Sequence, residues 1–322
     1  MTIIDKKKQV AIKAVLKAGE LCKQVQAEMV LSDTIQKHDR SPVTIADYGS
    51  QAVICKAISK VFPNDTIVAE EDANSLKQNT SLLKRVTNYV NSTIGENVTG
   101  TCICDWIDRG MGVVNNSFWT LDPIDGTKGF RRQDQYAIAL AWIVDGNVEL
   151  GILGCPNLPL SLDDSDSERG CLFVAVRGKG TVVYTLEGRN LGKIRVSENN
   201  YRLAESFEST HGDSSTHHKI AKQLGFNKSP IQIDSQAKYG IVARGEAALY
   251  IRLPNPKFPD YRECIWDHAA GLIVVEEAGG KVTDANGKPL NLLSGRRMTE
   301  NRGVVATNGT LHEQVLSVIS SM

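Results

Sequence analysis

A run of β-rich segments over residues 118–185 constrains the fold more than any other feature of the sequence. Residues 136–144 and 148–153 are mostly apolar, and the pair Asp145-Gly146 lies between them. An Asp-Gly pair between two β-rich runs is a strong hairpin signal. A second hairpin is expected around residues 178–180, where two glycines flank a lysine. These signals predict an antiparallel sheet in the middle of the chain.

Helical spacing precedes this sheet. Between residues 11 and 29 apolar side chains recur every three or four positions, which places them on one face of a helix. The same spacing predicts helices at about residues 47–62 and at residues 80–94. A short strand at residues 66–69 is expected between them, with Glu70 at its end.

The last third of the chain has a different texture, in which strands and helices alternate. Residues 266–280 read as a helix that ends at a left-handed Gly279. A chain of 322 residues is long enough to divide into two parts that share a core. We therefore expect an α+β lobe with an antiparallel sheet over residues 1–190 and an α/β lobe over residues 191–322.

Charge and cysteine content exclude several classes of protein. The 37 basic residues balance the 37 acidic ones, so no net field would hold the chain on nucleic acid or on an anionic membrane. No apolar run approaches the roughly 20 residues that span a bilayer. The seven cysteines lack zinc-ligand spacing, which indicates reduced thiols. A soluble cytoplasmic enzyme, expected to be a monomer, is the prediction.

Two aspartates lie three positions apart in the segment Leu-Asp-Pro-Ile-Asp-Gly-Thr. Pro123 favours an extended Asp122, and Gly126 permits a reversal directly after Asp125. Both carboxylates can then point at one place, where they would repel each other unless a cation lay between them. Mg²⁺ is suited to such oxygen ligands. In isolation the same pattern also fits an ordinary Asp-Gly turn.

Three further segments of the chain, together with this one, resemble the motifs of a known superfamily. The chain resembles the superfamily of lithium-sensitive, magnesium-dependent phosphatases, to which inositol monophosphatases and fructose bisphosphatases belong. The matching segments are Pro-Val-Thr-Ile-Ala-Asp at 42–47, Val-Ala-Glu-Glu-Asp at 68–72, Asp-Pro-Ile-Asp-Gly-Thr at 122–127 and Trp-Asp-His-Ala-Ala-Gly at 266–271. Lys-Gly-Phe at 128–130 with Gln-Tyr-Ala at 135–137 resembles its 3'(2'),5'-bisphosphate nucleotidase branch.

The resemblance covers about residues 7–310, with Ala69 where the family usually has glycine. It implies a layered αβαβα sandwich of the inositol monophosphatase and fructose bisphosphatase type. The active site is then expected between two lobes.

The resemblance also implies metal ligands, which would hold two to three Mg²⁺ ions. The first ion would be held by Glu70, Asp122 and the main-chain carbonyl of Ile124; the second by Asp122, Asp125 and Asp267; a weaker third would lie near Asp47 and Glu70. Asp267 also reads as a helix N-cap, and both roles are compatible.

Asp47 and the Thr127 hydroxyl are the catalytic residues that the resemblance implies. Together they would take the proton of the attacking water, with Glu70 as an alternative base. Thr127 also fits a helix N-cap after Gly126. The amides of Gly126 and Thr127 would meet phosphate oxygens at that helix start.

Cations in the second lobe would distinguish a bisphosphate from a monophosphate substrate. Alternation along the strand predicts that Arg252 points away from Ile251 and Leu253, into a cleft. The substrate-binding residues implied by the resemblance are Gly126, Thr127, His211, Ser235, Lys238, Tyr239, Arg252 and Asp267, with Tyr239 stacking on adenine.

The implied substrate is a small nucleotide, 3'-phosphoadenosine 5'-phosphate, which would give AMP and phosphate. Its 5'-phosphosulfate analogue is also expected to react, and Li⁺ is expected to inhibit by competing for a Mg²⁺ position. The alternatives are an inositol polyphosphate 1-phosphatase or an inositol monophosphatase of the same superfamily. A nucleotide sensor without activity is disfavoured, because a sensor needs no general base.

Overall fold

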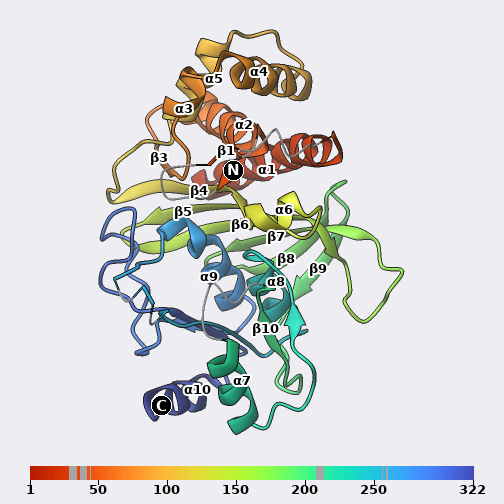
Figure 1. Cartoon of the computed structure of the whole chain (residues 1–322), viewed down its shortest axis with the longest axis vertical. Helices are drawn as coiled ribbons and strands as arrows, with labels where there is room; N and C mark the ends of the chain where they lie inside the picture. The colour runs from red at the N-terminus through yellow and green to blue at the C-terminus, as the bar shows by residue number, and fades with distance from the viewer. Residues whose placement is uncertain (29–34, 37–41, 44, 208–213, 256, 259) are drawn as a thin grey trace.

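The computed structural model describes residues 1–28, 35–36, 42–43, 45–207, 214–255, 257–258 and 260–322. A seven-stranded sheet crosses the middle of the molecule, with strands in chain order from β3 to β9 (Figure 1). Only β3 and β4 are parallel, and every other neighbouring pair is antiparallel. The strands are β3 (Thr66–Ala69), β4 (Ser117–Asp125), β5 (Ala137–Val144), β6 (Asn147–Pro159), β7 (Arg169–Val176), β8 (Gly180–Thr185) and β9 (Asn190–Ile194).

A five-stranded sheet lies below it in the same view, in the order β11-β10-β12-β14-β13. Its β10 is parallel to β11 and β12, whereas β14 is antiparallel to both its neighbours. The strands are β10 (Leu203–Glu205), β11 (Ile231–Gln232), β12 (Leu249–Arg252), β13 (Lys281–Thr283) and β14 (Val304–Thr307). A separate two-stranded ribbon pairs β1 (Ile35–Gln36) with β2 (Pro42–Val43).

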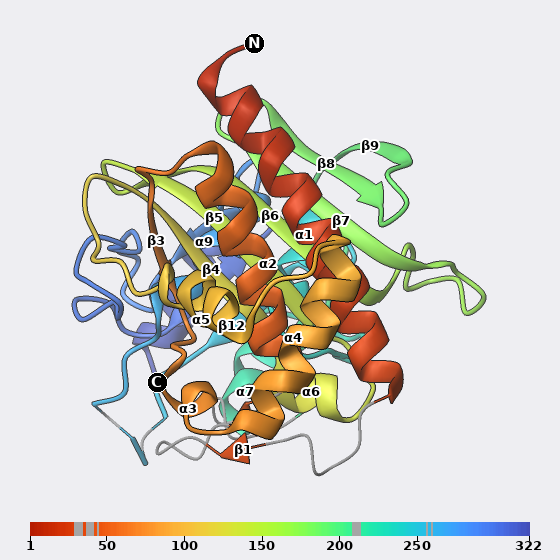
Figure 2. The ribbon, with the colours of Figure 1, turned by 90° about the horizontal axis from the view of Figure 1, so that it is seen from above.

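Helices cover both sheets and fill the space between them. Helices α1 (Ile3–Glu28) and α2 (Ile45–Val61) lie over the outer face of the large sheet, and Figure 2 shows α4 (Thr80–Ile94) beside them. Helices α8 (Ala237–Ala243) and α9 (Ala269–Glu276) lie between the sheets. Below the small sheet lie α7 (Ser214–Gln223) and α10 (His312–Ser320). The result is the αβαβα sandwich that the sequence predicted.

Strand alternation divides the core into layers. In β5, Ala139 and Ile143 face the core between the sheets, whereas Ile138 and Leu140 face α1 and α2. Gly151 in β6 allows α9 to approach closely, because a Cβ there would lie 2.3 Å from Ile273 Cγ2. Helix α9 thereby packs directly against β6.

Most predicted elements are confirmed, including the hairpin at Asp145-Gly146, where φ is 48° and 80°. The predicted helix at 266–280 is divided, because a 3-10 turn η3 (Ile265–Asp267) precedes α9. His268 is the N-cap residue of α9, so the predicted N-cap role of Asp267 is wrong for this helix. The Asp267 carboxylate instead accepts a bond from the main-chain nitrogen of Cys264 at 3.4 Å.

The remaining helices are short or lie on the outside of the first lobe: α3 (Asn74–Lys77), α5 (Gly100–Asp108) and α6 (Thr127–Arg131). The lobe boundary at residue 190 stays a prediction; the large sheet ends at Ile194 and the small sheet begins at Leu203. Among the described helices, none is long and apolar enough to cross a bilayer. All seven cysteines are free thiols.

Candidate active site

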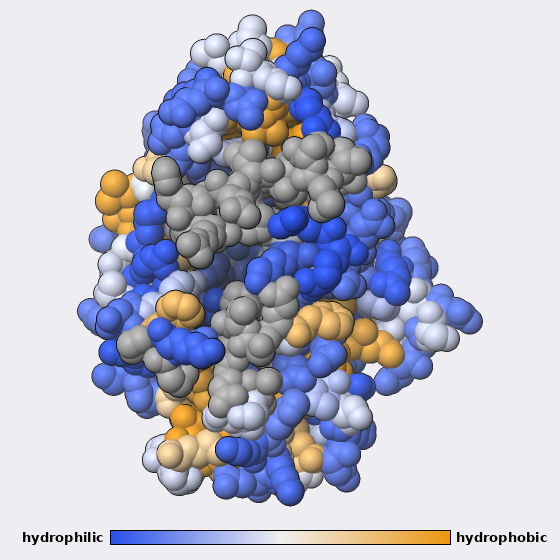
Figure 3. All heavy atoms as spheres, viewed as in Figure 1, coloured by the Kyte–Doolittle hydropathy of each residue, from blue (hydrophilic) through white to orange (hydrophobic). Residues whose placement is uncertain are grey.

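A cavity of about 820 Å³ lies where the end of β4 faces α8, β12 and η3. Both lobes contribute to its wall. Ten of the predicted site residues line it: Glu70, Asp122, Ile124, Asp125, Gly126, Thr127, Ser235, Lys238, Arg252 and Asp267. On the face seen in Figure 3, hydrophilic side chains gather across the middle of the molecule.

Parallel pairing of β3 with β4 brings the first carboxylates together. Ala69 pairs with Leu121, so Glu70 and Asp122 each follow at the same end of the sheet. The main-chain nitrogen of Glu70 donates to the Leu121 carbonyl at 3.2 Å. Asp125 follows after an irregularity in the pairing with β5, and η3 brings Asp267 against β4. Four carboxylates from three segments that lie far apart in the sequence therefore share one cavity.

These carboxylates oppose one another's ionisation. Burial, followed by the charges of Glu70 and Asp125, holds the pKa of Asp122 well above its usual range. Burial also raises the pKa of Asp125 to about 6, although Lys238 opposes the shift. The pKa of Asp267 is likewise raised, chiefly by burial, with Arg252 opposing. Buried, mutually repelling oxygen ligands of this kind suit a hard divalent cation.

Gly126 and Thr127 lie where β4 turns into α6. Gly126 has a φ of 87°, and a Cβ added to it would lie 3.0 Å from Ser235 Cβ. Glycine thus allows the two lobes to approach each other at this point. The Thr127 hydroxyl donates to the Ile124 carbonyl at 3.2 Å, and Thr127 is the first residue of α6 rather than its N-cap.

Asp47 is buried in the first turn of α2, and its charge contributes to the raised pKa of Asp122. It therefore lies close to the acidic end of the cavity. A proton relay from Thr127 to Asp47 stays a prediction.

Ser235, Lys238 and Arg252 line the cavity from the second lobe. Lys238 is only 4% exposed, and its Nζ donates to the Ile233 carbonyl at 3.2 Å. Burial lowers the pKa of Lys238 to about 8, against the opposing effect of Asp125. Arg252 lines the cavity together with Tyr250, as the alternation along β12 predicted.

Tyr239 does not fit its predicted role. Its ring is fully buried, and a Cβ on Gly271 would lie 2.2 Å from it. Its hydroxyl contacts His268 Nδ1 at 2.7 Å. A ligand in the cavity cannot stack on this ring; Tyr250 and Tyr261 are the tyrosines in the cavity wall. His211 lies outside the described residues.

Glu263 and His268 are residues that the sequence interpretation missed. Arg252 Nη2 forms an ion pair with Glu263 at 2.8 Å, and His268 Nε2 lies 3.4 Å from the same carboxylate. Burial disfavours ionisation of Glu263, yet Arg252 and His268 outweigh it and lower its pKa to about 2. The only signal in the sequence is a charged residue four positions before Asp267.

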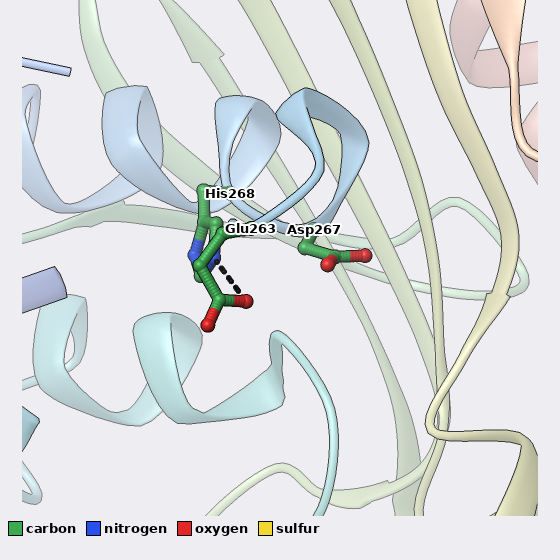
Figure 4. Close-up of side chains that lie close together, drawn as sticks. All are labelled: Glu263, Asp267 and His268. Carbon is green, nitrogen blue, oxygen red and sulfur yellow. Dashed lines mark hydrogen bonds and ion pairs between the residues drawn. The ribbon is translucent and has the colours of Figure 1, made fainter. Parts of the chain in front are cut away.

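Glu263, Asp267 and His268 offer ligand atoms within 4.8 Å of one another. Figure 4 shows Glu263 and His268 turned toward each other, while the Asp267 carboxylate points away from them. Both ring nitrogens of His268 already have partners, Glu263 and the Tyr239 hydroxyl. We therefore assign His268 and Glu263 to the support of Arg252. Only Asp267 belongs to the acidic cluster, which consists of Glu70, Asp122, Asp125 and Asp267.

Arg296 is a third missed residue, and it comes from the loop before β14. Its Nη2 donates to the Ala69 carbonyl at 2.5 Å, and its guanidinium lies 4.6 Å from the centre of the Trp266 ring. One side chain thus joins the segment that carries Glu70 to the segment that carries Asp267.

Comparison with known protein families identifies the class of protein to which this fold and this cavity belong. A model described as the inositol monophosphatase family matches residues 4–322. The chain belongs to the inositol monophosphatase family, a family of metal-dependent phosphatases.

Relatives within the family carry more specific names. The chain is 41% identical to a 3',5'-bisphosphate nucleotidase 2 of Arabidopsis thaliana, over 98% of this chain and 96% of the relative. It is 38% identical to a 3'(2'),5'-bisphosphate nucleotidase of Schizosaccharomyces pombe, over 99% of this chain and 96% of the relative. A protein of the same name from Dictyostelium discoideum is 40% identical, over 98% and 97%.

Solved structures agree on the fold. An IMPase of Thermotoga maritima superposes with a TM-score of 0.66 at 23% identity, covering 98% of this chain and 97% of the other. An inositol monophosphatase of Anabaena gives a TM-score of 0.64 at 21% identity, covering 100% and 98%.

Proposed function

We propose that this chain is a magnesium-dependent 3'(2'),5'-bisphosphate nucleotidase. It removes the 3'-phosphate of 3'-phosphoadenosine 5'-phosphate to give AMP and phosphate, and it accepts the 5'-phosphosulfate analogue. The observation that carries the proposal is one cavity with carboxylates from the first lobe and the buried cations Lys238 and Arg252 from the second. The names of the relatives support the same substrate class.

The two sets of charges have different tasks. The carboxylates of Glu70, Asp122, Asp125 and Asp267 and the carbonyl of Ile124 would hold Mg²⁺. When bound, Mg²⁺ neutralises phosphate charge and lowers the pKa of coordinated water. Lys238 and Arg252 would hold the phosphate that is not cleaved, since an arginine can bind a phosphate bidentately.

Hydrolysis requires one bond to form and one to break. Water attacks phosphorus, the bond from phosphorus to the 3' oxygen breaks, and this oxygen takes a proton from solvent as it leaves. Thr127 and Asp47 would take the proton that the water loses, with Glu70 as the alternative base. Because water is the nucleophile, no covalent enzyme intermediate is needed.

An inositol phosphatase of the same family is the other candidate. It would need the acidic end of the cavity but no second dianion site. The relatives named as nucleotidases favour the nucleotide, whereas the inositol monophosphatase structures are below 25% identical and bear on the fold alone.

We also propose an inhibitor, a cellular compartment and an oligomeric state for the protein. Li⁺ should inhibit by competing with Mg²⁺ for the carboxylates. The free cysteines support a reducing compartment, and we propose a cytoplasmic monomer that acts on small nucleotides without nucleic-acid or membrane partners.

A panel of substrates tests the proposal. Phosphate release should be measured from 3'-phosphoadenosine 5'-phosphate, an inositol bisphosphate, an inositol monophosphate and fructose bisphosphate, with Mg²⁺, with EDTA and with added Li⁺. We expect a preference for the nucleotide, loss of activity in EDTA and inhibition by Li⁺. Equal rates on all substrates would overturn the substrate assignment, and activity that survives EDTA would overturn the metal requirement.

A further inference from the structure

Gln236 is buried at the start of α8. It contacts Asp125 and the segment that carries Asp267, two of the four carboxylates in the cavity. Its main-chain nitrogen donates to the Asp125 carboxylate. Its side-chain Nε2 donates to the Trp266 carbonyl at 2.9 Å, and its Oε1 accepts from the Gly271 nitrogen at 3.0 Å. Only 2% of the residue is exposed, so these bonds do not compete with bulk water.

The two side-chain bonds fix the segment that carries Asp267. Trp266 directly precedes Asp267, and Gly271 lies one turn further on in α9. Gln236 therefore joins the main chain on both sides of Asp267 to a residue that also holds Asp125. These two carboxylates come from different lobes, so Gln236 connects the two lobes at the cavity through its main-chain nitrogen and its side-chain amide.

We propose that Gln236 is a positioning residue that holds Asp125 and Asp267 at the separation required for a shared divalent cation. This inference rests on the proposed function, because it takes both carboxylates as metal ligands. Gln236 does not contact the cation or the substrate; it acts through the two aspartates. Partners that orient metal ligands typically contribute about 10- to 100-fold to metal affinity.

Gln236→Met is the principal test variant. Methionine has a similar length, removes both side-chain hydrogen bonds and leaves the main-chain bond to Asp125. Gln236→Asn is the second variant, because its amide is too short to reach both Trp266 and Gly271.

Thr181→Val is the matched control. The buried Thr181 hydroxyl donates to the Val274 carbonyl at 2.8 Å, so the control removes a buried bond to α9 at a distance from the cluster.

Mg²⁺ binding to the full chain should be measured by calorimetry, together with kcat as a function of Mg²⁺. We expect the Kd for Mg²⁺ to rise about tenfold or more in Gln236→Met and to rise in Gln236→Asn. The kcat of both variants should approach the wild-type value at saturating Mg²⁺. Thr181→Val should bind Mg²⁺ as the wild type does.

Several results would overturn the inference. One is a Kd for Mg²⁺ in Gln236→Met within about twofold of wild type. Another is a loss of kcat that saturating Mg²⁺ does not restore while the Kd is unchanged, since that indicates a purely structural role. If Gln236→Met does not fold, an unchanged Kd in Gln236→Asn has the same meaning. A wild-type chain that binds no Mg²⁺ would instead overturn the proposed function, and the inference with it.

Discussion

Arg252 and Glu263 form an ion pair, with Nη2 of the arginine 2.8 Å from the carboxylate, at the basic end of the cavity. The cation expected to bind phosphate is thus paired with a carboxylate of its own chain. His268, itself bonded to Tyr239, fixes that partner in turn. These contacts fix the position of the guanidinium in the cavity wall.

Breaking this pair should increase the stabilisation that the product AMP gives to the folded protein. Glu263→Gln leaves a largely buried guanidinium without its counter-charge, which we expect to destabilise the ligand-free protein by about 3 kcal/mol. The 5'-phosphate of AMP would supply a new counter-charge. AMP should therefore raise the Tm of Glu263→Gln by more than it raises the wild-type Tm.

Glu276→Gln is the control, because its pair with Arg177 at 2.7 Å lies outside the cavity. Its AMP-induced shift in Tm should match the wild type. Equal shifts in Glu263→Gln and wild type would contradict the proposed contact between Arg252 and the 5'-phosphate.

Burial and the charges of Glu70, Asp125, Asp267 and Asp47 all oppose the ionisation of Asp122 and raise its pKa. Asp122→Asn removes one of the repelling charges and a proposed ligand of both metals. Turnover should fall below a few per cent of wild type, while circular dichroism remains native and the Tm in EDTA does not decrease. A variant that keeps substantial activity would refute the metal assignment.

Mg²⁺ should stabilise the protein more at neutral than at acidic pH. The folded-state pKa of Asp125, about 6, lies above its ordinary value of 3.8. The metal-free folded protein therefore binds a proton at Asp125 more tightly than the unfolded chain does. The contribution of Asp125 to stability falls as pH rises from 3.8 to about 6. A shift of this size corresponds to about 3 kcal/mol.

Mg²⁺ replaces the proton, so the increase in Tm on adding Mg²⁺ should be large at about pH 7.5 and small at about pH 5. Comparing samples with and without Mg²⁺ at each pH cancels the titration of groups elsewhere. An increase in Tm that is independent of pH would show that Mg²⁺ does not bind at these carboxylates.

Gly126→Ala tests the close approach between the lobes. Its positive φ and the contact with Ser235 Cβ predict a loss of at least about 1–2 kcal/mol of stability, together with reduced activity. Gly188→Ala is a matched control, since Gly188 has a φ of 89° but no atom within 4 Å of the added Cβ. Gly188→Ala should lose stability without losing activity, and denaturant unfolding with kcat/KM measures both. Equal activity in the two variants would contradict the account.

Local signals in the sequence predicted most of the fold. Residues close together in the sequence were enough to predict the Asp145-Gly146 turn, the apolar stripe of α1 and the turn after Asp125. The same holds for the outward and inward alternation of β12, which correctly placed Arg252 in the cavity wall.

The features that the sequence did not predict depend on contacts between distant segments. Tyr239 is buried because Gly271 leaves room for its ring, and the support of Arg252 by Glu263 requires β12 and η3 to be in place. Asp267 belongs to a 3-10 turn because its carboxylate bonds back to Cys264. Such pairings have no periodicity along the chain that could reveal them.

The preference for a second phosphate tests the central claim most directly. The kcat/KM should be compared for 3'-phosphoadenosine 5'-phosphate and for adenosine 3'-monophosphate, which presents the same bond to be cleaved but lacks the other dianion. We predict a preference of about 100-fold for the bisphosphate in the wild type, and Arg252→Met should reduce this preference at least tenfold, with Lys238 left to contact the second phosphate. Equal kcat/KM values on both substrates would contradict the division of the cavity into a metal-binding end and a phosphate-binding end.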